Sequence, residues 1–417
     1  MIQKLSSTTE LEQQLDSNGQ TELARPLRVM FLLTSMPIGG AETLLVNLVR
    51  SSDPTRIEPM VACMKHQDVL GDELAKEIPV FEKLINHKYD FAVLGRLKRL
   101  FKKQKVDALI TVGAGDKMFW GRMAARRAGV PVVLSALHST GWPDGVGRLN
   151  RMLTPITDGF IACAKQHADY QVENEKFPKE KVFLIPNGID TNRFMFDQDA
   201  RDSWRKELGI APEAPAVGIV AALRPEKNHD LFLESARQVI SRFSDSQFVI
   251  AGDGPERHRL ESLATEKGIQ DNVHFIGSTQ DVVGVLSMVD MFALTSHNEA
   301  SPVSIMEALS CQRPVVATDV GSIDESVIEG ETGFLVPAED AEAMAARWLE
   351  ILRDKELQTR LGSNGREHII NNSSVESMTE GYMSLVEDLY ARKTGQAIRG
   401  EEGRVEWSHE FGEEDSA

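Results

Sequence analysis

The sequence predicts an α/β protein with two Rossmann-like, doubly wound parallel-sheet domains. Short apolar runs alternate with longer amphipathic stretches along most of the 417 residues, which is typical of parallel sheets covered by helices. The alternation begins again near residue 215, after a segment without a strand pattern. The glycine-rich and charged motifs directly follow apolar runs, and ligands of open parallel sheets bind at the carboxyl ends of the strands.

The first half contains predicted strands separated by glycine loops and by helices such as AETLLVNLVRSS and DKMFWGRMAARRAG. These strands lie at 28–35, 58–64, 106–113, 130–138, 159–165 and 181–190. The second half repeats the alternation through AVGIV, QFVIAGD, NVHFIGS, DMFALTS, RPVVATDVGS and GFLVP.

Domain boundaries follow from these patterns. Residues 400–417 carry seven acidic side chains and one arginine, so we expect the tail to be solvated and disordered. We expect an extension over 1–25, a first domain over 26–195, a second over 213–370, a helix crossing back to the first domain over 371–395, and an acidic disordered tail over 396–417.

Composition narrows the class of protein. A hydrophobic share of 41% and a charged share of 26% are those of a soluble globular protein, and the net charge of −17 argues against nucleic-acid binding. Three widely spaced cysteines indicate neither disulfides nor a zinc site.

The start lacks a signal-peptide core and no apolar run approaches the roughly 18 residues of a membrane span, so we expect a cytoplasmic location. The basic stretch 95–105 is either a solvated helix face or an electrostatic contact, with an acidic glycan or with the anionic inner face of the membrane.

Two glutamates, Glu299 and Glu307, flank a predicted strand-to-helix turn in SHNEASPVSIMEALS. Pro302 suits the first helical position, with Ser301 as a candidate cap. Carboxylates accept hydrogen bonds from hydroxyl groups.

The same turn offers a cradle for phosphate, because a helix start has free N–H groups and a positive dipole end. Pro302 has no N–H, so Val303 and Ser304 are the expected donors. Hydroxyl-binding carboxylates on both sides of a phosphate cradle fit a sugar nucleotide.

Two glycine pairs also follow strands. Gly39 and Gly40 in PIGGAE, and Gly252 and Gly254 in AGDGPER, could bring backbone close to a ligand. Simple tight turns fit both motifs equally well. The third glycine of the dinucleotide fingerprint is missing.

Three side chains at strand ends are further candidates. Arg224 and Lys227 in ALRPEKNH could neutralise a diphosphate leaving group, or they could be solvated surface charges. His138 ends a predicted strand and could bind a hydroxyl or phosphate, or serve the structure alone.

Together these motifs resemble those of the retaining family-four glycosyltransferases of the GT-B fold, in which two Rossmann-like domains face each other across a cleft. The resemblance covers about residues 27–390. It rests on GGAE, IPNGID, LRPEKNH, AGDGPE, TGFLVP and, most specifically, NEASPVSIMEALSCQRPVVATDVGSIDESV.

The resemblance implies a role for each matching position. Glu307 would bind the ribose hydroxyls of the donor, Glu299 the transferred sugar, and Lys227 the diphosphate. The two GGAE glycines would lie against the diphosphate from the first, acceptor-binding domain, and His138 matches the family's histidine near the sugar.

The chain departs from the family pattern at Ala222, where an arginine that binds phosphate is usual. Arg224 lies two residues on, a spacing that keeps the same strand face, and could substitute for it. A lesser departure is Ser322, where glycine is usual. The DQD at 197–199 matches a metal-binding pattern but lies in the expected linker, so we assign it to chance and predict no metal and no cofactor.

The function expected from the resemblance is transfer of a hexose unit from a nucleotide diphosphate sugar to an acceptor hydroxyl, with retained anomeric configuration. The expected partners are this donor and a glycan or lipid-linked acceptor. Two alternatives stay open. One is a sugar-nucleotide epimerase of the same fold. The other is a binding scaffold that has lost catalysis, an alternative supported by Ala222 in place of the usual arginine.

Overall fold

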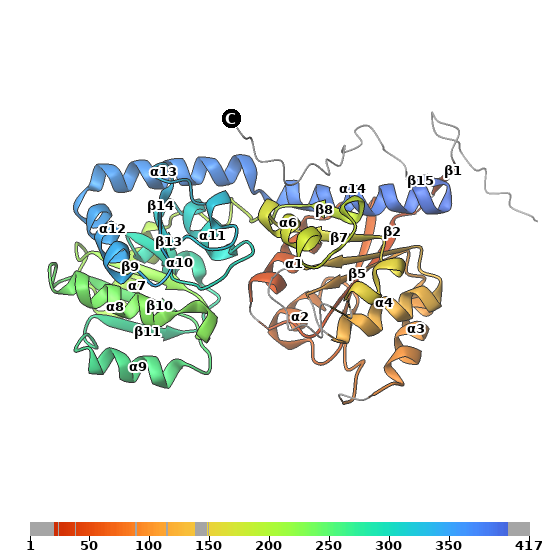
Figure 1. Cartoon of the computed structure of the whole chain (residues 1–417), viewed down its shortest axis with the longest axis horizontal. Helices are drawn as coiled ribbons and strands as arrows, with labels where there is room; N and C mark the ends of the chain where they lie inside the picture. The colour runs from red at the N-terminus through yellow and green to blue at the C-terminus, as the bar shows by residue number, and fades with distance from the viewer. Residues whose placement is uncertain are drawn as a thin grey trace, which may run out of the picture.

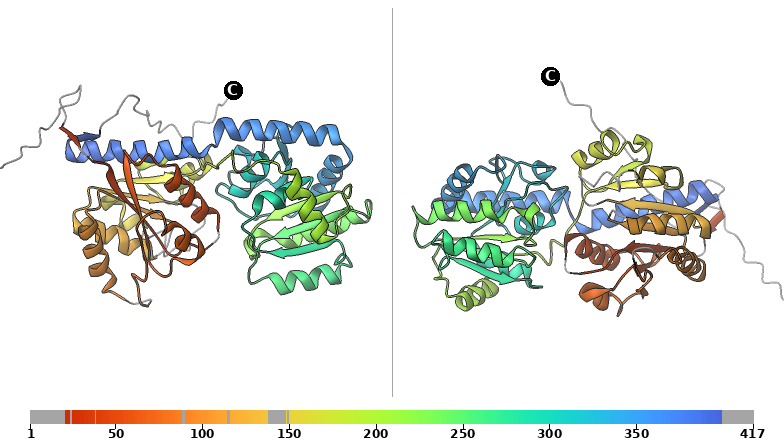
Figure 2. Two further views of the ribbon diagram at one scale, coloured as in Figure 1. Left: turned by 180° about the vertical axis from the view of Figure 1, so that it is seen from behind. Right: turned by 60° about the horizontal axis from the view of Figure 1, so that its bottom comes forward.

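The computed structural model describes residues 21–23, 25–37, 39–87, 90–113, 116–137, 148 and 150–398. Two α/β lobes lie side by side, and the helices α13 (Lys355–Asn372) and α14 (Val375–Thr394) run along one side of them (Figure 1). One lobe contains a seven-stranded sheet and the other a six-stranded sheet. Helices lie on both sides of each sheet (Figure 2), which confirms the predicted fold class.

The first lobe orders its parallel strands β4-β3-β2-β5-β6-β7-β8. The predicted strands of this half are all present, and β4 is an additional two-residue edge strand that is too short to give an apolar pattern. The strands are β2 (Leu27–Leu33), β3 (Ile57–Cys63), β4 (Val80–Phe81), β5 (Ala108–Val112), β6 (Val132–Ala136), β7 (Gly159–Ala162) and β8 (Val182–Leu184). The helices are α1 (Gly40–Ser51), α2 (Asp68–Leu74), α3 (Val93–Gln104), α4 (Asp116–Ala128) and α6 (Lys165–Glu173), with the 3-10 turns η1 (Thr154–Ile156) and η2 (Lys179–Lys181).

The second lobe orders its parallel strands β11-β10-β9-β12-β13-β14. This is the 3-2-1-4-5-6 order of dinucleotide-binding folds, whose ligands bind where the order reverses, here between β9 and β12. The strands are β9 (Ala216–Val220), β10 (Gln247–Ala251), β11 (Val273–Gly277), β12 (Met291–Leu294), β13 (Val315–Thr318) and β14 (Gly333–Val336). The helices are α7 (Gln198–Leu208), α8 (His229–Ile240), α9 (Arg257–Glu266), α10 (Val282–Met288), α11 (Val303–Ser310) and α12 (Ala341–Arg353), with η3 (Pro225–Lys227) and η4 (Ile323–Glu325).

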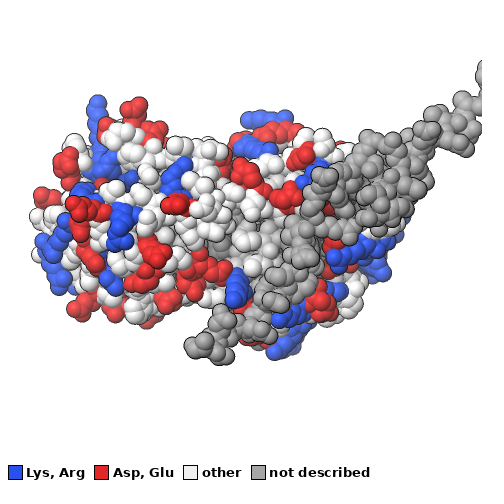
Figure 3. All heavy atoms as spheres, turned by 90° about the horizontal axis from the view of Figure 1, so that it is seen from above, with Lys and Arg blue, Asp and Glu red and all other residues white. Residues whose placement is uncertain are grey.

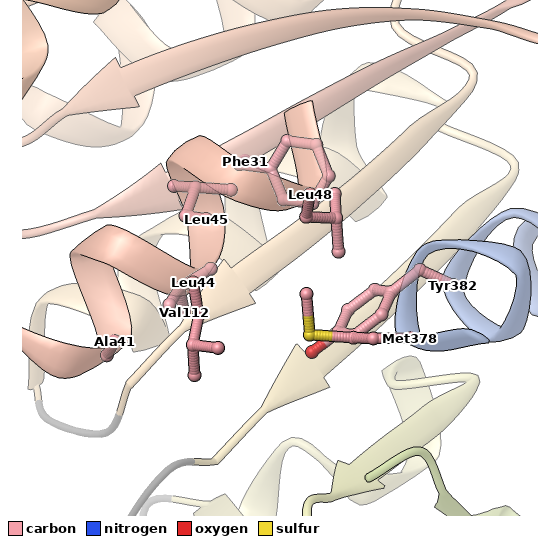
Figure 4. Close-up of a pocket in the computed structure, with 8 residues that line it drawn as sticks. All are labelled: Phe31, Ala41, Leu44, Leu45, Leu48, Val112, Met378 and Tyr382. Carbon is pink, nitrogen blue, oxygen red and sulfur yellow. The ribbon is translucent and has the colours of Figure 1, made fainter. Parts of the chain in front are cut away.

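The last long helix, α14, packs back on the first lobe as predicted. Its Met378 and Tyr382 face the leucines of α1 and belong to the same apolar core (Figure 4). The cavity between them has a volume of about 20 Å³, roughly the room of one water molecule, so a sugar or a nucleotide does not fit there.

The chain crosses between the lobes after β8 and again before α14, and the two crossings are bonded to each other. The amide of Ile189 donates to the Ser373 carbonyl at 3.0 Å, and the amide of Val375 donates to the Ile189 carbonyl at 3.0 Å. A Cβ on Gly188 would lie 2.1 Å from the Ser374 carbonyl oxygen, so glycine is required at this approach. We call residues 187–190 and 372–375 the hinge.

Two segments differ from expectation. The expected linker between the two predicted domains contains α7, which packs against α10 of the second lobe. Asp197 of the DQD sequence caps this helix by accepting from the Ala200 amide at 2.9 Å, so it has a local structural role.

The chain ends also differ in part from the extension and the disordered tail that we expected. Residues Gln396–Ile398 form β15, which pairs in parallel with β1 (Thr21–Leu23). Gly395, with a φ of 71°, ends α14 in the left-handed region and redirects the chain into this pairing.

The described surface mixes both signs of charge. On the side where α13 and α14 lie, acidic and basic side chains are interspersed (Figure 3). Within the described residues, no helix is both long and apolar enough to span a bilayer.

Candidate active site

The loops after β9 and β12 meet at the point where the strand order reverses. The Lys227 ammonium lies 2.5 Å from Oε1 of Glu299. The Thr295 hydroxyl donates to the Lys227 carbonyl at 3.0 Å, and the His297 amide donates to the Glu226 carbonyl at 2.9 Å. Two predicted site residues that are distant in sequence are therefore in direct contact.

Glu299 is held in a defined orientation. The buried Ser296 donates its hydroxyl to Oε1 of Glu299 at 2.6 Å, the same oxygen that contacts Lys227. The side chain of Glu299 is 10% exposed and that of Lys227 is 25% exposed. The second carboxylate oxygen and the remaining ammonium protons can therefore bind a ligand without rearrangement of this pair.

Glu307 has a different environment in the second turn of α11. Only 8% of the residue is exposed, and burial raises the pKa of its carboxyl to about 8, with the positive charge of Arg193 acting in the opposite direction. The two glutamates of the motif therefore differ: one is ion-paired, and the other is buried and easily protonated.

The start of α11 corrects one detail of the sequence prediction. The helix begins at Val303, with Pro302 as its N-cap at φ −74° and ψ 110° and without a side-chain cap. Ser301 is therefore not the cap, and its carbonyl accepts instead from the Asn187 side chain of the hinge at 3.3 Å. Val303 and Ser304 are the first two helical residues, whose amides have no intrahelical partners.

The first lobe meets this helix start through its glycine loop. A Cβ on Gly40 would lie 3.6 Å from Cγ2 of Val303, in ordinary contact across the two lobes. Gly39 is extended, and a Cβ there would lie 2.5 Å from Oε2 of Glu42. Burial raises the pKa of Glu42, and the charge of Arg224 from the second lobe acts in the opposite direction.

Arg224 itself lies at the rim of the site. Its side chain is 62% exposed, and its guanidinium is 3.9 Å from Glu226. This exposure leaves the guanidinium free to turn toward a ligand, and its substitution for the arginine missing at Ala222 stays a prediction.

Gly252 and Gly254 have a packing explanation. Cβ atoms at these positions would lie 1.9 Å from the Ala221 carbonyl oxygen and 2.3 Å from the Leu223 carbonyl oxygen. The glycines allow the loop after β10 to pack on the loop that leads to Lys227. A direct contact with the donor at these glycines stays a prediction.

His138 lies outside the described residues. Ser296 and Glu42 were not predicted as site residues, although both lie within the motifs, because nothing local shows which side chain a serine or a glutamate will contact. Across the described part of the chain, no three His, Cys, Asp or Glu residues are grouped as metal ligands would be.

Two family models match the chain. The model described as "Glycosyltransferase Family 4" matches residues 38–193, and "Glycosyl transferases group 1" matches residues 200–368. The site described above lies mainly in the second match, and the glycine loop lies in the first.

Curated relatives include two enzymes with named donors. The chain is 26% identical to the UDP-Gal:alpha-D-GlcNAc-diphosphoundecaprenol alpha-1,3-galactosyltransferase of Escherichia coli, over 78% of this chain and 87% of that protein. It is 23% identical to the GDP-mannose-dependent monoacylated alpha-(1-6)-phosphatidylinositol monomannoside mannosyltransferase of Corynebacterium glutamicum, over 84% of this chain and 94% of that protein.

Among solved structures, Anabaena HepE in complex with UDP-glucose superposes with a TM-score of 0.77 at 20% identity, over 87% of this chain and 100% of that chain. This likeness shows the fold.

Proposed function

Because the chain belongs to the family-four glycosyltransferases of the GT-B fold, we propose that it transfers a hexose unit from a nucleotide diphosphate sugar to an acceptor hydroxyl with retained anomeric configuration. The observation that carries the proposal is the contact between Lys227 and Glu299 where the strand order reverses. In this proposal Lys227 would bind the diphosphate and the adjacent Glu299 would bind the sugar.

Cleavage of the sugar–phosphate bond places negative charge on the leaving diphosphate. Lys227 and the free amides of Val303 and Ser304 would stabilise that charge, with Arg224 turning in from the rim. Glu299 would hold sugar hydroxyls and Glu307 would hold the ribose. The same positive groups support a metal-independent reaction, in which the departing phosphate accepts the proton of the acceptor hydroxyl on the same face.

The acceptor that we propose is a lipid-linked or polysaccharide glycan. The names of the Escherichia coli and Corynebacterium glutamicum relatives, which contain diphosphoundecaprenol and phosphatidylinositol, support a lipid. So does α3, on which Arg99, Lys102 and Lys103 are exposed, and Phe91, two residues before this helix, is 71% exposed.

This basic face would hold the first lobe against an anionic membrane. Each basic residue near such a surface contributes about 1 kcal/mol. We expect the double change Lys102→Glu and Lys103→Glu to lower binding to phosphatidylglycerol vesicles at least tenfold, while binding to phosphatidylcholine vesicles stays unchanged. Equal binding of the parent and the double variant to the anionic vesicles would show that this surface is not the membrane contact.

The test of the proposed function begins with thermal unfolding against UDP-, GDP- and ADP-sugars, because a ligand at 100 times its dissociation constant adds about 2.7 kcal/mol to stability. The donor found is then incubated with lipid-linked acceptors, with and without EDTA, and the product linkage is read by NMR. We expect retained configuration, transfer that EDTA does not inhibit, and a sharp loss in Glu307→Ala. Conversion of the donor sugar without an acceptor would indicate an epimerase instead.

A further inference from the structure

A carboxylate from the second lobe caps a helix of the first. Oε2 of Glu325, in η4, accepts from the Lys165 amide at 3.0 Å, and its Oε1 accepts from the Gln166 amide at 3.1 Å. The Gln166 side chain donates to both carboxylate oxygens of Asp324, at 3.1 and 3.0 Å. These four hydrogen bonds join the two lobes directly.

The capped helix, α6, has no cap of its own. Its N-cap residue is Ala164, which makes no side-chain hydrogen bond. The first amides of a helix need acceptors, and the positive end of the helix dipole attracts a carboxylate. Glu325 supplies both from the opposite lobe, so this stabilisation exists only while the lobes are together.

The loop that carries Glu325 also touches the sugar-binding side of the site. Gly321 has a φ of +57°, and a Cβ there would lie 1.8 Å from the backbone carbonyl oxygen of Glu299. The Ser322 amide donates to the same oxygen at 3.4 Å. The segment 321–326 is therefore bonded to Glu299 at one end and to α6 at the other.

The same segment lies near the hinge. Nε2 of His368, on α13, is 3.3 Å from the Glu325 carbonyl oxygen, and α13 leads directly into residues 372–375. Rotation about the hinge would move Glu325 relative to α6, while the hydrogen bond from the Ser322 amide to the Glu299 carbonyl, inside one lobe, stayed intact.

We propose that Glu325 is a positioning residue: its carboxylate latches the second lobe onto α6 of the first and thereby fixes Glu299 relative to the acceptor-binding lobe. The inference goes beyond the proposed function and rests on it, because closure matters only if a donor held at Glu299 must meet an acceptor held by the first lobe. Glu325 acts through the lobe geometry and need not touch either substrate.

The test measures the distance between the lobes directly. Spin labels are placed on the full chain at the exposed positions Lys76→Cys and Glu266→Cys, since the native cysteines are all buried. Glu325→Ala, Glu325→Gln and the control Glu331→Gln, an exposed glutamate of the same lobe, are compared with the parent by pulsed EPR.

We expect Glu325→Ala to broaden and lengthen the distance distribution and to lower kcat at least tenfold, with the thermal shift by the donor nucleotide sugar retained. Glu325→Gln keeps one acceptor oxygen for one amide and should lie between the parent and Glu325→Ala, while Glu331→Gln should match the parent. An unchanged distance distribution in Glu325→Ala overturns the proposal whatever its activity. If no nucleotide sugar shifts the parent, the proposed function fails, and the distance comparison still decides the latch.

Discussion

The replacement Lys227→Ala tests the site most directly, because the chain supplies a matched control. Lys227 contacts Glu299 at 2.5 Å with side chains 25% and 10% exposed, and Lys267 contacts Glu234 at 2.5 Å with side chains 22% and 29% exposed. Both pairs lie in the second lobe, join a lysine to a glutamate at the same distance, and bury the lysine to a similar degree. Only the first lies where the strand order reverses.

The two variants should lose similar stability. A partly exposed ion pair contributes about 0.2–1 kcal/mol, and the greater burial of Glu299 places Lys227→Ala toward or slightly above the upper end of that range. Activity should separate them, because removal of one group that stabilises transition-state charge lowers kcat by about 10²–10³, or roughly 3–4 kcal/mol. Lys267→Ala should keep the parent kcat.

The assay follows release of the nucleoside diphosphate at saturating donor and acceptor, with urea unfolding of each variant measured alongside. The reasoning fails if Lys227→Ala retains a kcat within about threefold of the parent. It also fails if Lys267→Ala loses activity to the same extent, because the loss would then follow from a broken ion pair anywhere in the lobe.

The remaining predictions concern Glu307, the loop beside Glu299, and the α1–α14 contact. Burial raises the folded-state pKa of Glu307 from 4.5 to about 8, so the stability from keeping it neutral is complete below about pH 4.5 and is lost as pH rises through 8. Between these pH values the free energy of unfolding of Glu307→Gln should rise relative to that of the parent by up to a few kcal/mol. A constant difference between the two proteins across this pH range would contradict the raised pKa. Gly321→Ala should abolish transfer and should destabilise the protein more than Gly330→Ala. Both residues have positive φ, of +57° and +72°, but a Cβ on Gly321 would meet the Glu299 backbone, while a Cβ on Gly330 would have open space. Equal effects of the two changes on thermal unfolding and kcat would show that backbone strain alone acts. Tyr382→Ala should cost about 3–5 kcal/mol in urea unfolding, since the residue is 7% exposed and packs between α14 and α1; a loss below about 1 kcal/mol would mean that α14 is not needed to close this core.

Local sequence patterns are enough to predict the two sheets and the edge at which the candidate site lies. Apolar periodicity reports which residues are buried, and parallel strands bring their carboxyl ends to one edge, so the positions of Glu299 and Lys227 could be predicted from local patterns. The helix after Glu299 was also predictable, but its first residue is Val303 and not Pro302, because proline is compatible with both the cap and the first turn and the neighbouring sequence does not distinguish them.

Which of these groups touch depends on how the strands and lobes are arranged in space. Lys227 reaches Glu299 because β9 and β12 are adjacent in the sheet, and Glu325 reaches α6 because the two lobes lie against each other there. Such contacts join loops that are far apart in sequence, and they depend on strand order and lobe orientation. Local periodicity encodes burial but not these two quantities, so the partners of Glu42, Ser296 and Glu325 could not be predicted from it.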